Sequence, residues 1–309
     1  MFSVSRLQLA FVTAVVLVGC SALPLSSPKG QGDMPLVGTA QTAKSQSLLY
    51  LSDVATNDVY IYSYPQGKLV GTLTAFARPR SECADAVGHV WIADVQAFQV
   101  VEYAHGASEP IAALSTFGAP RGCSVDPRSG DLAVTGGIQG TILSIYPRRL
   151  HGGWGDARRY SDPSMSVAHF CGYDAAGNLF IDGASKAKGG TFRLAELPRR
   201  AKALVNLTIS QSISVAGQVQ WDGKHIVVGD AGVSPSLVYR FSVSGRSATE
   251  VGATTLGDST SVRQFWIQSK NLIGPDFASH VGFWRYPAGG SPTKTIGDVH
   301  GYGAAVSAP

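Results

Sequence analysis

A short apolar segment recurs six times along the chain, and this repeat restricts the fold more than any other feature. The clearest copy is His-Val-Trp-Ile-Ala-Asp, at residues 89–94. The six copies end at Asp53, Asp94, Gly136, Gly183, Asp230 and Asp276. The ends are 41, 42, 47, 47 and 46 residues apart. A period of roughly 40 to 50 residues with several short strands in each unit is typical of a β-propeller.

Each unit has the pattern of four strands joined by tight turns. In the second unit we expect strands at residues 82–85, 90–94, 100–103 and 110–114. Charged residues make up only 15% of the chain and glycine accounts for 36 of its 309 residues, which suits short strands and many turns. The sequence therefore predicts an all-β fold, a six-bladed propeller of about four antiparallel strands per blade, over residues 47–309.

The first unit, which begins at Ser47, lacks an innermost strand. The segment 303–307 near the C-terminus, Gly-Ala-Ala-Val-Ser, resembles the missing strand. We expect it to complete the first blade, because a ring closed in this way leaves no sheet edge exposed.

The repeat resembles that of the NHL-type six-bladed β-propellers: an apolar strand with Asp, a turn with Gly, then an apolar strand that ends in Asp. The resemblance implies a binding or interaction module, with catalysis not favoured. The alternative is a metal-dependent hydrolase of the gluconolactonase-like type, a family that holds its divalent ion with one Glu, an Asp and Asn side chains. In this chain Glu82 is the suitable Glu, and Asn is scarce on the inner strands.

The N-terminal residues have the pattern of an export signal. Arg6 precedes an apolar run over residues 7–19, and Leu-Val-Gly-Cys at 17–20 resembles the bacterial lipobox. We therefore expect a signal peptide at 1–19, lipidation of Cys20, and a flexible tether over 20–46. The expected location is the cell envelope, either on the outer membrane or facing the periplasm. A net charge of +4 gives no reason to expect nucleic acid as a partner.

Cysteines and the recurrent aspartates are expected to serve the scaffold. Cys83, Cys123 and Cys171 fall on innermost strands of successive units, and we expect buried free thiols. The alternatives are one disulfide and a metal or reactive site. The aspartates that end the apolar segments are expected to accept backbone N–H groups. A calcium site is the alternative for these carboxylates, and no cofactor is otherwise expected.

Ligand-binding residues are sought among the side chains that the units do not share. The loops that lead into the innermost strands should open at one mouth of the central channel, where a polar or anionic ligand could meet Arg forks and amide groups. The candidate residues are Arg80, Glu82, Arg121, His169, Gln220, Gln264 and Tyr302. The alternative is that they are solvated loop residues or form hydrogen bonds between blades. The expected partner of this monomer is a small molecule, a peptide or an envelope protein.

Overall fold

The computed structural model describes residues 45–138, 140–277 and 280–309. This part of the chain contains strands, turns and bends, and no helix. It accordingly has no helix of the length and apolarity needed to cross a bilayer. The expected signal peptide, Cys20 and the tether up to residue 44 lie outside the described residues.

Four sheets have four strands each. The first has the order β24 (Gly301–Ser307), β1 (Leu48–Asp53), β2 (Asp58–Ser63), β3 (Leu69–Leu73). The second has the order β4 (Pro79–Ala84), β5 (Val90–Asp94), β6 (Gln99–Tyr103), β7 (Pro110–Ser115). The third has the order β8 (Pro120–Val125), β9 (Leu132–Gly136), β10 (Leu143–Tyr146), β11 (Arg158–Tyr160). The last along the chain has the order β20 (Trp266–Gln268), β21 (Asn271–Asp276), β22 (His280–Arg285), β23 (Lys294–Gly297).

The remaining sheet has eight strands. One half is β12 (Met165–Tyr173), β13 (Leu179–Ser185), β14 (Phe192–Leu197), β15 (Val205–Ile209). The other half is β16 (Ala216–Trp221), β17 (Ile226–Asp230), β18 (Ser236–Ser244), β19 (Ser247–Leu256). The halves meet where β15 and β19 pair in parallel over two residue pairs, whereas every other pairing in the sheet is antiparallel.

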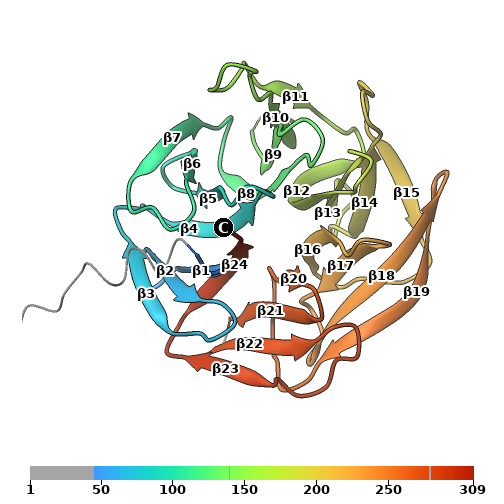
Figure 1. Ribbon diagram of the computed structural model, residues 1–309. Coiled ribbons are helices and arrows are strands. Elements are labelled where there is room, and N and C mark those ends of the chain that lie inside the picture. Colours follow the sequence, from blue (N-terminus) through green and yellow to red (C-terminus); the bar gives the residue numbers. More distant parts are fainter. Residues whose placement is uncertain (1–44, 139, 278–279) are drawn as a thin grey trace, which may run out of the picture. The chain divides into compact units, whose positions relative to one another are not determined.

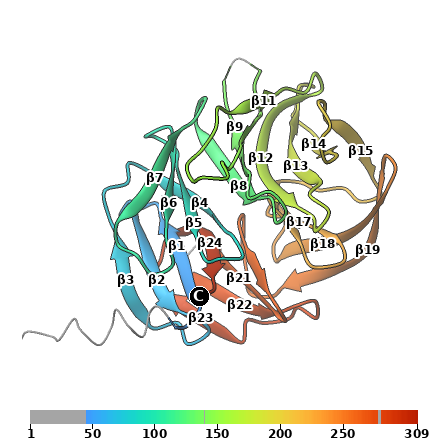
Figure 2. The same ribbon diagram turned by 45° about the horizontal axis from the view of Figure 1, so that its top comes forward.

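The sheets of the described chain stand around a common centre, each with its first strand inward (Figure 1). The inward strands are β24, β4, β8, β12, β16 and β20, and the eight-stranded sheet supplies two of them from its opposite ends (Figures 1 and 2). Neighbouring inward strands contact one another from β24 through β4, β8 and β12 to β16. This arrangement brings residues from distant parts of the sequence together at the centre.

Apolar side chains fill the spaces between successive sheets. In one cluster Tyr50 and Val59 of the first sheet pack with Ile92 and Val101 of the second, all 5% exposed or less. The strands between two such layers are buried on both faces, which explains why their sequences are apolar runs and not alternations. β5 (Val90–Asp94), the clearest copy of the repeat, is buried at every position.

The C-terminal strand pairs with β1, which confirms the expected closure. β24 runs antiparallel to β1 from the pair Leu48 and Ser307 to the pair Asp53 and Gly301. The first sheet is thus built from both ends of the described chain, and neither edge of β1 is left open.

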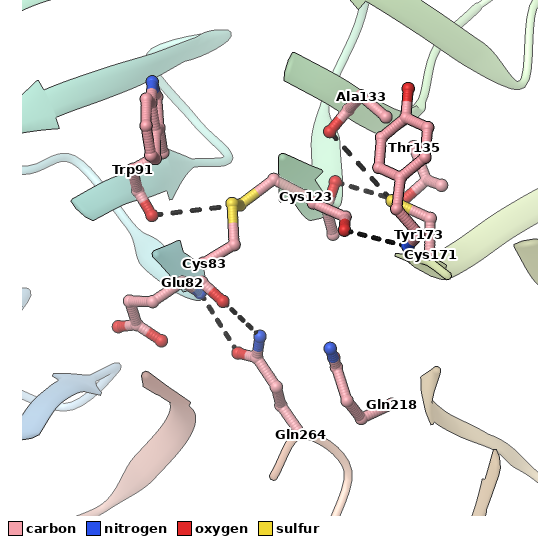
Figure 3. Close-up of a disulfide and its surroundings, with 12 residues drawn as sticks. Glu82, Cys83, Trp91, Cys123, Ala133, Thr135, Cys171, Tyr173, Gln218 and Gln264 are labelled. Atoms are coloured by element: carbon pink, nitrogen blue, oxygen red, sulfur yellow. Dashed lines mark hydrogen bonds between the residues drawn. A yellow bond between two sulfur atoms is a disulfide. The ribbon is translucent and has the colours of Figure 1, made fainter. Parts of the chain in front are cut away.

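The expectation of three free thiols is wrong for two cysteines. Cys83 of β4 and Cys123 of β8 form a disulfide with a Cα–Cα distance of 5.7 Å, whereas Cys171 is a buried free thiol (Figure 3). Cys123 lies three residues before its turn aspartate and Cys83 only two, so the two side chains point to opposite sides of their strands. Because the strands are neighbours in a ring, opposite sides face each other, and the offset brings the sulfurs together.

Candidate functional site

Five of the six inward strands contain a β-bulge near their first residues, and β12 contains two. In β4, Pro79 pairs with Asp94 and Ser81 with Ala93, so Arg80 is the extra residue. In β8, Arg121 is extra in the same way. A bulge turns a side chain away from the regular alternation of the strand, and bulges are common beside functional sites.

The same position can be identified in all the inward strands. In β24, β4, β8 and β16 it is the first residue after the pair that precedes the bulge, and in β12 it is the first residue after the pair Ala168 and Gly183, which precedes the second bulge. Ahead of β20 it is the residue that follows Val262, which forms an isolated bridge with Asp276. In order around the centre, these residues are Tyr302, Arg80, Arg121, His169, Gly217 and Arg263. We call this set the bulge ring. Four of the seven candidates from the sequence, Arg80, Arg121, His169 and Tyr302, belong to it.

The bulge ring is cationic, and its side chains are close enough to act on one another. The Arg80 guanidinium stacks on the Tyr302 ring, 4.6 Å from its centroid. Burial lowers the pKa of Arg80; Tyr302 opposes this effect, and Arg78, Arg121 and Arg263 add to it. Arg80 Nε is buried with no hydrogen-bond partner in the described residues. The described carboxylates form no ion pair with any of these arginines.

His169 shares this electrostatic environment. Burial lowers the pKa of its imidazole to about 4, and the positive charges of Arg121, Arg263 and Arg80 contribute to the decrease. At neutral pH the ring is therefore neutral and carries one donor and one acceptor nitrogen among three arginines.

Hydroxyl groups of second strands hold the bulges of neighbouring sheets. Ser52 Oγ donates to Arg80 O at 2.9 Å and accepts from Gly303 N at 3.0 Å. Thr135 Oγ1 lies 2.7 Å from His169 O and 3.2 Å from Gly122 O, and donates to both. The backbone of the bulge ring is thus fixed by contacts between sheets, which orients its side chains before any ligand arrives.

The recurrent aspartates anchor the loops that enter the inward strands. Asp94 accepts from Ala77 N and Arg78 N at 2.9 and 2.7 Å. Asp53, Asp230 and Asp276 accept backbone N–H groups in a similar way. The expected backbone role of these residues is confirmed, and it includes positioning Arg78 beside the bulge ring.

Glu82 lies deeper than the bulge ring. Its side chain is fully buried, and Figure 3 shows the carboxylate turned away from the disulfide. A Cβ built on Gly303 would stand 2.0 Å from Glu82 Oε2 and 2.4 Å from Arg80 O, so the carboxylate packs directly against β24. Burial raises the pKa of Glu82 to about 8, and Ser52 offsets part of the increase. Neither carboxylate oxygen has a partner with hydrogen-bond geometry in the described residues.

Both candidate glutamines use their amides on backbone groups. Gln264 accepts from Glu82 N at 3.1 Å and donates to Glu82 O at 2.6 Å (Figure 3). Gln220 forms the equivalent pair with Ile267 N and O, at 2.8 and 3.2 Å. These amides connect inward strands of different sheets and so support the site without facing it.

A cavity of about 260 Å³ lies at the opposite end of the inward strands. Its lining includes the disulfide, Cys171 and Trp221. Asp174 is the charged residue in this lining, and its carboxylate oxygens accept from Ala176 N and from the backbone and side-chain amides of Asn178. The two ends of the ring therefore differ: arginines gather at the bulge end, whereas the charged residue in the cavity lining is a carboxylate.

Gly217 and Arg263 are the bulge-ring members that the sequence did not reveal, and Arg263 is the charged one of the two. In the second, third and fourth units the bulge-ring residue lies five residues before an aspartate in the turn that follows the inward strand. These turn aspartates are Asp85, Asp126 and Asp174. The last unit has Ser269 in the turn and a longer irregular segment before β20, so the same count leads to Gln264.

In the part of the chain that the structure describes, no three His, Cys, Asp or Glu side chains are grouped to hold a metal ion.

Comparison with solved structures agrees with this architecture. A chain in a crystal structure of a nidogen/laminin complex superposes with a TM-score of 0.66 over 84% of this chain and 98% of its own length, at 12% identity. The fold is a β-propeller. A protein of unknown function from Bacteroides caccae gives 0.61 over 85% and 99%, at 10% identity. The Cps50 (Swd1) propeller domain of Myceliophteria thermophila gives 0.55 over 81% and 82%, at 12% identity. No family model and no curated protein matches the propeller sequence.

Proposed function

We propose that this β-propeller is a binding module that recognises an anionic ligand at the bulge ring. The observation that carries the proposal is the convergence of Arg80, Arg121 and Arg263 from β4, β8 and the segment before β20, without an ion pair to any described carboxylate. Guanidinium groups bind carboxylates and phosphates through charge-assisted, often bidentate, hydrogen bonds. The proposal requires no metal ion or other cofactor.

The proposal includes six blades and an NHL-type repeat. The eight-stranded sheet counts as two blades, because its halves share only the short parallel pairing between β15 and β19. With this division every blade has four antiparallel strands and contributes one inward strand. Each blade also supplies one position of the bulge ring.

We also propose export and lipid anchoring at the cell envelope, through Cys20. Support comes from the lipobox-like residues 17–20 and from the Cys83–Cys123 disulfide, since disulfides persist mainly in oxidising compartments. Metabolic labelling with a palmitate analogue tests the anchor: the wild-type chain should be labelled and Cys20→Ser should not. Equal labelling of the two would contradict lipidation at this residue.

Calorimetry with citrate and with tripolyphosphate tests the binding function. We expect saturable binding of at least one of these anions to the purified protein, weakened about tenfold or more by Arg121→Gln together with Arg263→Gln, since each charge-assisted contact contributes about 1.5–3 kcal/mol. Arg193→Gln is the matched control, because Arg193 is exposed on β14, outside the ring. No binding of either anion, or equal binding by the double variant, would reject the proposal.

A further inference from the structure

The charge of the bulge ring exceeds what one monovalent anion would neutralise. Three guanidinium groups, with Arg78 beside them, act on one another electrostatically, and none of them forms an ion pair with a described carboxylate. They come from β4, β8 and the segment before β20, so they approach the centre from different directions. A ligand with several anionic groups could contact more than one of them at once and relieve more of their repulsion.

His169 completes this arrangement as a group that can change its charge. The ionisable groups that act on its imidazole are Arg121 from β8, Arg263 from before β20 and Arg80 from β4. On β13, the Asp182 carboxylate is directed to the N–H of Phe170, the residue that follows His169 on β12, at 2.8 Å. The imidazole thus belongs to the arginine cluster and has no described carboxylate as an ion-pair partner.

We infer that the bulge ring binds a ligand carrying two or more carboxylate or phosphate groups, and that His169 takes up a proton when this ligand binds. The inference rests on the proposed anion-binding function and adds its ligand class and its coupling to pH. The reason is reciprocal linkage. Positive charges beside His169 oppose its protonation, so an anion that offsets them favours the proton, and the proton favours the anion equally.

The sign of the pH effect follows from the free and bound states. In the free protein burial and the three arginines hold the pKa of His169 at about 4. A bound polyanion raises it toward the ordinary value of about 6.5. In the window between these values the complex holds more protons than the free protein. Affinity therefore increases as pH falls through this window, by up to about tenfold for each unit that the pKa rises.

Ligands of constant charge separate this effect from protonation of the ligand itself. Benzenedisulfonate and benzenesulfonate differ in valence and keep their charges throughout the window. We expect the disulfonate to bind at least about tenfold more tightly, as one further charge-assisted contact would give. Titrations in two buffers with different ionisation enthalpies should show net proton uptake at about pH 5.5, where the buried Glu82 carboxyl already holds its proton. Equal affinity for the two sulfonates, or no proton uptake, would overturn the inference.

The variant His169→Gln tests the assignment of the proton. It should lose both the proton uptake and the increase in affinity at acid pH, each measured against the variant's own affinity for the disulfonate at about pH 8. Arg193→Gln, on the outer part of the propeller, should behave as the wild type throughout. Retained proton uptake in His169→Gln would overturn the role of this residue. Citrate and tripolyphosphate, compared at about pH 8, then distinguish a carboxylate from a phosphate ligand. Failure of all these anions to bind would reject the proposed function itself, an outcome distinct from binding without proton uptake.

Discussion

His105 Nδ1 lies 2.6 Å from Ser307 Oγ, and this contact holds the closing strand of the propeller against the neighbouring sheet. The same imidazole contacts Gln46 O through Nε2, at 3.0 Å. Ser307 Oγ in turn donates to Gly88 O at 2.6 Å. His105, in the turn that follows β6, therefore holds both β24 and Gln46, which precedes β1. Ring closure depends on the pairing of β24 with β1.

Removing this imidazole should weaken closure. We expect His105→Ala to reduce the free energy of unfolding by about 1–3 kcal/mol, because two hydrogen bonds are lost and Gln46 O loses a partner. His151→Ala is the control, since His151 is exposed. Urea unfolding followed by tryptophan fluorescence measures the difference. If His105→Ala is as stable as the His151 control, the contacts of His105 with Ser307 and Gln46 do not contribute to closure.

The disulfide should contribute more, because it joins two inward strands 40 residues apart in sequence. Replacing both Cys83 and Cys123 by Ala should lower the free energy of unfolding by about 4 kcal/mol, the chain-entropy value for a loop of that length. Cys171→Ala, which removes one buried free thiol, should cost only about 1 kcal/mol. A thiol assay of the denatured, unreduced Cys20→Ser protein should detect one reactive group. Detection of three would contradict the disulfide.

The buried carboxyl of Glu82 should make stability depend on pH. The folded protein holds this proton up to a pKa of about 8, whereas the unfolded chain releases it near 4.5. Between these values the folded state binds more protons, so stability decreases as pH rises, by up to about 1.4 kcal/mol per pH unit. The variant Glu82→Gln should lack this decrease and gain on the wild type by about 4 kcal/mol between about pH 5 and 8. Parallel stability profiles for Glu82→Gln, wild type and the exposed-site control Glu109→Gln would contradict a raised pKa.

The sequence predicted those features that depend on local pattern. The strands of the second unit, the aspartates that cap loops and the closing strand at 303–307 all follow from apolar runs and turn residues within short stretches. Arg80, Arg121 and His169 were identifiable because they lie where loops lead into the innermost strands, and each lies five residues before a turn aspartate. The number of residues between a side chain and the turn aspartate gives its position along the strand. Residues with the same number are therefore expected at the same end of the inward strands.

Features that depend on the approach of different sheets were not predictable in this way. The pairing of Cys83 with Cys123 requires knowing that neighbouring inward strands face each other edge to edge. The backbone contacts of Gln220 and Gln264 depend on residues in other sheets, 47 and 182 positions away in sequence. Arg263 was hidden because the unit that contains it has lost the turn aspartate from which the others are counted.

Thr135 should act on the site through the bulge that it holds. Its hydroxyl is buried and donates to His169 O at 2.7 Å. Thr135→Val keeps the shape and removes the donor, so we expect a loss of about 1–2 kcal/mol in the free energy of unfolding. Anion affinity should fall as well, because the His169 carbonyl loses the contact that fixes the bulge. Thr135→Ser keeps the hydroxyl and should restore affinity even where it does not fully restore stability. If Thr135→Val loses stability but binds anions as tightly as the wild type, the hydroxyl serves the packing of the sheets and does not position His169.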